Sequence, residues 1–108
     1  MRHRDVYAAL ADPTRREILE LLRKRRSVNV RDIASRFRRL SRPAISQHLR
    51  VLRECGLVTS EVKGRENLYV LDPRPILRAR DGWLAGFGNE HVERLKALRR
   101  RRVEREVR

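Results

Sequence analysis

The sequence predicts a mainly α-helical fold with one small β-hairpin. Before Gly56, apolar residues recur mostly at the three- and four-residue spacing of amphipathic helices. After Gly56 come two β-rich runs around a glycine turn, LVTSEVKGRENLYVLD, which predict a hairpin. The pairs Asp12-Pro13 and Asp72-Pro73 each combine a helix cap with proline at the first helical position. At 108 residues, the chain can form one domain with a modest core.

The first third of the chain is predicted to contain three short helices and a brief strand. Residues 4–11 and 13–25 form the first two helices. Residues 27–30 are too few for a helix and include two valines, so they can pair as a short strand. Asn29 can cap a third helix over residues 30–38. The apolar side chains of these helices are Val6, Tyr7, Leu10, Ile18, Leu19, Leu21, Leu22, Ile33, Ala34 and Phe37.

The segment from Leu40 to Gly56, LSRPAISQHLRVLRECG, predicts a fourth helix with one polar and one apolar face. Ser41 can cap its start, and Gly56 suits a left-handed end. The apolar stripe consists of Ile45, Leu49 and Leu52. The opposite side consists mostly of Arg42, Ser46, Gln47, Arg50 and Arg53. Such a face carries donors and acceptors that can contact base edges in a major groove, although a merely solvated charged face is the alternative.

The hairpin directly follows this helix, and its tip, Lys63-Gly64-Arg65, is basic. The order of elements is therefore a helix-turn-helix with a β-hairpin appended. A hairpin in this position forms a wing, which can lie against a phosphate backbone or a minor groove.

A last helix is predicted to begin after Asp72-Pro73 and to carry apolar residues as far as Leu98. Three glycines, Gly82, Gly86 and Gly88, each weaken it by about 0.8–1 kcal/mol relative to alanine, so a bend or break is expected among them. We expect one domain over residues 1–98 and a frayed or partly helical basic tail over 99–108.

The charge balance favours a polyanionic partner. The net charge is +14, from 28 basic and 14 acidic residues, and 25 of the basic residues are arginine. Arginine suits bidentate contacts with phosphate or guanine. No apolar run approaches the length of a membrane span, and the first residues lack the apolar core of a signal peptide. Cys55 is the single cysteine, which fits a reducing cytoplasm.

Enzymatic function is not expected. The sequence has no glycine-rich nucleotide loop, no metal-binding cluster and no supported pairing of a nucleophile with a base. Its acidic residues are scattered beside arginines, as in surface ion pairs.

Three segments, residues 8–22, 45–58 and 63–72, together with the Trp83-bearing last helix, resemble the ArsR-type winged-helix transcriptional repressors over roughly residues 4–98. The resemblance implies a cytoplasmic homodimer that binds double-stranded operator DNA in successive major grooves, with the first and last helices at the dimer interface. Carried over by position, the DNA contacts would be Ser41, Arg42, Ser46, Gln47, His48, Arg50, Lys63 and Arg65. The interface would contain Tyr7, Leu10, Trp83, Leu84, Phe87, His91, Leu95 and Leu98.

The chain departs from the metal-sensing members that it resembles. Residues 30–37 contain no cysteine. Asp81 is followed by Gly82 and Trp83, so it does not begin an Asp-x-His pair, and His91 is left as a lone candidate ligand in the last helix. We therefore expect no metal site and no cofactor, and the sequence names no effector.

Several alternatives remain open at this stage. His48 can contact DNA or only support local packing, and Trp83 with Phe87 can line a small-molecule pocket or pack in a core or interface. For the whole protein, the leading hypothesis is a dimeric, sequence-specific repressor. A nonspecific or architectural nucleic-acid-binding protein is the alternative, and a sensor of metals or small molecules is a third.

Overall fold

Three helices begin at capping residues that the sequence predicts, whereas the helix after Asp72-Pro73 begins at Arg74, one residue later than predicted. In this computed structural model, which describes residues 5–107, the Asp12 side chain accepts hydrogen bonds from the backbone N–H groups of Thr14 and Arg15. Asn29 and Ser41 cap two further helices in the same way. The helices are α1 (Val6–Ala11), α2 (Pro13–Lys24), α3 (Val30–Arg36), α4 (Arg42–Glu54), α5 (Arg74–Asp81) and α6 (Asn89–Val107), with one 3₁₀ turn, η1 (Trp83–Gly86). Residue 4, where the sequence predicts the start of the first helix, lies outside the described residues.

Helix α4 ends as the sequence predicts, at a glycine in the left-handed conformation. Gly56 has a φ of 75°, and its N–H donates to the carbonyl of Arg53. The next N–H, of Leu57, donates to the carbonyl of Leu52 at 3.0 Å. These two bonds satisfy carbonyls at the helix end and direct the chain into the hairpin.

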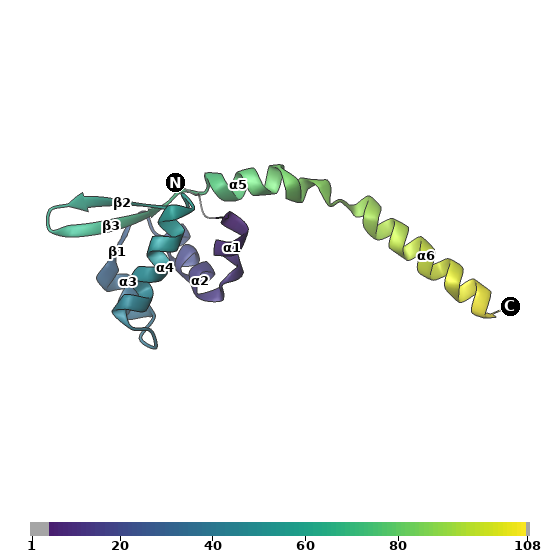
Figure 1. The fold of residues 1–108 in the computed structure, drawn as a ribbon, viewed down its shortest axis with the longest axis horizontal. Helices are drawn as coiled ribbons and strands as arrows, with labels where there is room; N and C mark the ends of the chain where they lie inside the picture. Colours follow the sequence, from purple (N-terminus) through teal and green to yellow (C-terminus); the bar gives the residue numbers. More distant parts are fainter. Residues whose placement is uncertain (1–4, 108) are drawn as a thin grey trace. The chain divides into compact units, whose positions relative to one another are not determined.

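A three-stranded antiparallel sheet follows the order β1-β3-β2, where β1 is Val28–Asn29, β2 is Val58–Lys63 and β3 is Glu66–Leu71. Val28 pairs with Tyr69, which confirms the expected short strand. Strands β2 and β3 form the predicted hairpin and extend past β1 (Figure 1). The hairpin turns at Gly64, whose φ of 65° favours glycine.

The hydrophobic core lies among α1 to α4 and the bases of the strands. Its buried members are Ala9, Ile18, Leu19, Leu22, Val28, Ile33, Phe37, Ile45, Leu49, Val51, Leu52, Leu57 and Val58. Val51 is buried although it lies outside the predicted stripe of α4. The fully buried side chains in the described part of the chain are all apolar, so this core fixes α4 through one face and leaves the other to solvent.

The described chain divides after Leu77 into two compact units. In the second unit, the predicted break occurs at the glycines. The N–H of Gly82 donates to the Arg78 carbonyl, and a Cβ at Gly82 would lie only 2.9 Å from that carbonyl oxygen. The predicted last helix is therefore two helices separated by η1. Helix α6 continues through the expected tail as far as Val107, and the proposed division between residues 98 and 99 stays a prediction.

In the described residues, no helix is both long and apolar enough to cross a membrane.

Candidate nucleic-acid interface

Helix α4 is anchored by its apolar face and displays its polar face. Ile45 and Leu52 are fully buried, whereas Arg42, Ser46 and Gln47 are exposed. Because α3 precedes α4 through a tight turn, in which the Leu40 N–H donates to the Phe37 carbonyl, the two helices form the predicted helix-turn-helix. The exposed side chains of α4 are thus held on a rigid helix, as readout of base edges requires.

Three of the predicted contact residues, Ser41, Arg50 and His48, already have intramolecular partners. The Ser41 hydroxyl accepts a hydrogen bond from the Ala44 N–H at 3.2 Å and caps α4. The Arg50 Nε donates to the Glu54 carboxylate at 3.1 Å, one helical turn further on. Both pairs are surface contacts, and a surface ion pair contributes little energy, so Arg50 can exchange Glu54 for an external anion at small cost.

The wing displays a basic tip. Lys63, Gly64 and Arg65 are all exposed, and Lys63 lies opposite Glu66 in the antiparallel register. The turn therefore places one lysine and one arginine at the end of the hairpin, where side chains can reach a phosphate backbone.

His48 lies at the inner edge of the polar face rather than on it. Its ring is half-buried, and its Nδ1 is 3.3 Å from Nη1 of Arg15 on α2. Arg15 also donates to the carbonyls of Ala8 and Ala9 at the end of α1. The contact joins α4 to α1 and α2, which is the packing role that the sequence left open beside DNA contact.

The same corner contains a carboxylate with a shifted pKa. Partial burial raises the pKa of Asp12, but hydrogen bonds from the Arg15 and Thr14 backbone N–H groups, together with the positive charge of Arg15, outweigh burial. The net result is a pKa below the ordinary value of 3.8. Asp12 therefore caps α2 as an ionised group near neutral pH.

The residues expected at a dimer interface lie in both units. In the first unit, Tyr7 is 37% exposed and Leu10 is half-buried against the core. In the second unit, Trp83 and Phe87 make an edge-to-face contact with ring centroids 4.8 Å apart. The His91 Nδ1 lies 3.3 Å from the Gly88 amide nitrogen, at the start of α6. The remaining predicted members, all exposed, are Leu84, Leu95 and Leu98.

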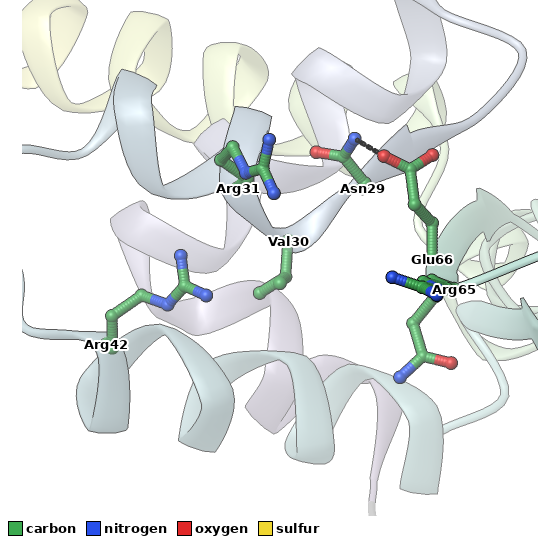
Figure 2. Close-up of a pocket in the computed structure, with 7 residues that line it drawn as sticks. Asn29, Val30, Arg31, Arg42, Arg65 and Glu66 are labelled. Carbon is green, nitrogen blue, oxygen red and sulfur yellow. Dashed lines mark hydrogen bonds between the residues drawn. The ribbon is translucent and has the colours of Figure 1, made fainter.

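A hollow of about 190 Å³, which sequence reasoning missed, lies between the helix-turn-helix and the wing. Figure 2 shows the side chains of Arg31, Arg42 and Arg65 around it, with Val30 between them. Arg31 is the second residue of the short helix α3, and the sequence offered only its positive charge as a signal. The hollow adds Arg31 to the candidate interface, beside the predicted Arg42 and Arg65.

Within residues 5–107, no three His, Cys, Asp or Glu side chains come together in a group that could hold a metal ion. Cys55 is half-buried, and its thiol lies 3.7 Å from the Asp5 carbonyl oxygen.

A helix-turn-helix with an exposed polar second helix, followed by a basic β-hairpin, defines the winged helix-turn-helix class of DNA-binding proteins. The family model described as "Bacterial regulatory protein, arsR family" matches residues 12–60. The transcriptional repressor SdpR of Bacillus subtilis is 36% identical over 86 residues, covering 80% of this chain and 92% of SdpR. The chain belongs to the ArsR family of transcriptional regulators.

Solved structures agree with this assignment. A possible transcriptional regulator for arsenical resistance matches with a TM-score of 0.71 and 40% identity, covering 87% of this chain and 95% of that one. An ArsR-like transcriptional regulator from Rhodococcus sp. RHA1 has a TM-score of 0.67 and 38% identity, covering 89% and 88% of the two chains. The protein is a DNA-binding transcriptional regulator and not an enzyme, as the sequence predicts.

Proposed function

We propose that the protein is a homodimeric, cytoplasmic repressor that binds an inverted-repeat operator and excludes polymerase from a promoter. The observation that carries this proposal is the exposed Ser46–Gln47 pair on α4, a helix held by a buried opposite face. An amide such as that of Gln47 can make a bidentate contact with adenine, which distinguishes one base pair from the others. The relative SdpR is a transcriptional repressor by name, which supports the direction of regulation.

Dimerisation is proposed from the second unit. Helix α6 has no buried residue, and its apolar side chains Leu95 and Leu98 are 49% and 64% exposed. Unpartnered apolar stripes of this kind usually mark an interface. A two-fold dimer would place its two recognition helices about 34–36 Å apart, which is one turn of DNA.

The DNA-contact set that we propose keeps the predicted residues and gives them different roles. Base readout falls to Ser46 and Gln47, whose side chains are exposed on α4, and Arg42 at the start of α4 contacts the backbone. Lys63 and Arg65 contact the backbone from the wing, and Ser41 and Arg50 contact it from the start and the body of α4. His48 adds a contact only through the ring nitrogen that does not face Arg15.

Recovery of bound genomic fragments tests the proposal. The protein is incubated with sheared DNA from its own genome, and the bound fragments are sequenced and footprinted. We expect a small set of fragments that share an imperfect inverted repeat, with half-sites one helical turn apart. The matched control is the Gln47→Ala variant, which should recover the same fragments less selectively. Uniform recovery of the whole genome by the natural protein would instead favour a nonspecific architectural binder.

A further inference from the structure

Three elements that are distant in sequence supply one arginine each to the hollow between the wing and the helix-turn-helix. Arg31 lies in α3, Arg42 opens α4, and Arg65 lies in the turn of the wing. In Figure 2 the guanidinium groups of Arg31 and Arg42 extend toward the same space from neighbouring helices, and Arg65 borders it from the hairpin. Among the ion pairs of residues 5–107, none involves any of these three side chains.

A hydrogen bond fixes the position of the wing relative to α3. The Asn29 amide nitrogen donates to the Glu66 carboxylate at 3.0 Å, as the dashed line in Figure 2 shows. The amide oxygen of Asn29 accepts from the Asp32 N–H at 2.8 Å and caps α3. One side chain thus joins the start of α3 to the base of the turn that carries Arg65. It also engages the one carboxylate that lines the hollow.

The charge of the hollow suits an anion with several acceptor oxygens. Three guanidinium groups and one carboxylate give a formal charge of +2 within about 190 Å³. A guanidinium group donates hydrogen bonds in a planar fork and accepts none, which matches the oxygens of a phosphate. Mutual repulsion among the three arginines is relieved when such an anion binds between them.

We propose that the hollow binds a single phosphate group of the DNA backbone, which Arg31, Arg42 and Arg65 hold together. This inference rests on the proposed function, because it concerns how the same surface contacts DNA. By sharing one phosphate, the three elements set the register of α4 in the major groove and the position of the wing with one contact. Phosphate contacts of this kind orient a protein on DNA and carry no sequence information themselves.

The salt dependence of DNA binding tests how many phosphates the three arginines neutralise. Affinity for a fluorescein-labelled random-sequence duplex is measured by anisotropy at several salt concentrations, for the natural protein and the triple variant Arg31→Gln, Arg42→Gln, Arg65→Gln. Loss of one phosphate per subunit lowers the log–log slope by about 0.9 per subunit, or about 1.8 per dimer. An unchanged slope would show that the hollow binds no DNA phosphate. A loss of about 2.7 per subunit, the value for three separate phosphates, would show that the three arginines do not share one phosphate.

Two further variants act as controls. Arg23→Gln removes the same charge from an exposed position on α2, where the side chain pairs with Glu20, and it should leave the slope unchanged. Asn29→Ser keeps a capping oxygen for α3 but cannot reach Glu66, so it should weaken binding to every duplex, as the triple variant should. Equal binding by Asn29→Ser and the natural protein would contradict the positioning role of this bond. Thermal unfolding of each variant shows that it remains folded.

A titration without DNA separates the two sources of phosphate. Inorganic phosphate is added to the natural protein and to Arg31→Gln in a calorimeter. Binding weaker than about millimolar in both proteins supports the DNA backbone as the source, because one phosphate alone lacks the rest of the DNA contact. Sub-millimolar binding that Arg31→Gln abolishes overturns this assignment in favour of a free phosphate ligand. If the natural protein binds no duplex at all, the proposed function fails, whereas a slope unchanged in the triple variant rejects only the hollow.

Discussion

Arg15 Nη1 lies 3.3 Å from Nδ1 of His48, and this contact joins the second helix to the recognition helix. Because a guanidinium group has no acceptor, the His48 Nδ1 must accept, and the ring proton then lies on Nε2. His48 therefore has one remaining polar atom for DNA, a donor, which can meet only an acceptor such as a phosphate oxygen or guanine N7. A residue chosen from the sequence as a DNA contact is in the first place part of the packing that orients α4.

Arg15 should matter for stability more than other surface arginines. Its side chain is only 17% exposed and bonds the carbonyls of Ala8 and Ala9, as well as His48. We expect Arg15→Gln to lower the free energy of unfolding by about 1–3 kcal/mol, because charged hydrogen bonds are lost from a half-buried site. Urea denaturation measures the change. Arg16→Gln, which loses a single exposed bond to the Leu10 carbonyl, is the control and should cost less than about 1 kcal/mol. Equal effects of the two substitutions would contradict the account.

Asp12 should make stability fall in acid. Since the pKa of Asp12 is lower in the folded state than its ordinary value of 3.8, the ionised carboxylate stabilises the fold above that value. This contribution is lost as pH falls through the folded-state pKa. We expect the natural protein to be more stable than Asp12→Asn at about pH 7, and the difference to shrink below about pH 4. Asn still caps a helix, so the difference isolates the charge. A difference that stays constant down to about pH 2 would disprove the role of the charge.

The apolar stripe of α6 should hold two chains together. Leu98 is 64% exposed, so Leu98→Glu removes no core contact and should leave the first unit folded. We expect the natural protein to sediment as a dimer at micromolar concentration and the variant to sediment as a monomer. Val62→Glu is the matched control, because Val62 is 77% exposed on the wing and lies outside the predicted interface. A monomeric natural protein would refute the proposed dimer.

The helix ends and the hairpin could be predicted because the residues that determine them lie within a few positions of one another in the sequence. Asp12, Asn29 and Ser41 each cap a helix through a bond to a backbone N–H two or three residues away, and Gly56 ends α4 through its own φ. The hairpin is likewise set by alternation around Gly64. Elements of this kind follow from residue types at short spacing.

The contacts between elements could not be predicted in the same way. Arg15 and His48 are 33 residues apart, and Asn29 and Glu66 are 37 apart, so only the packed core brings each pair together. The same packing buries Val51, which the helical stripe did not include. Arg31 could not be predicted as a contact, because a single arginine on a short helix gives no signal beyond its charge until Arg42 and Arg65 lie beside it.

Gln47 should determine base preference more than affinity. Its side chain is exposed on α4, and a bidentate amide contact with adenine discriminates by about 1–3 kcal/mol. We expect Gln47→Ala to lower the preference for the recovered operator over single-base variants by about 5- to 150-fold, while binding to random duplex changes little. Competition binding with the variant operators measures this. Gln47→Glu keeps the size of the side chain but not its donor, and it should also lose the preference for adenine.

The central claim is sequence-specific recognition, and the ratio of two dissociation constants tests it most directly. Affinity of the natural protein for a recovered operator fragment is compared with its affinity for a random duplex of equal length at physiological salt. The account predicts that the operator binds about 10³-fold or more tightly than the random duplex. A ratio near one would show that the charge of +14, rather than the exposed face of α4, determines DNA binding, and would contradict the proposed repressor.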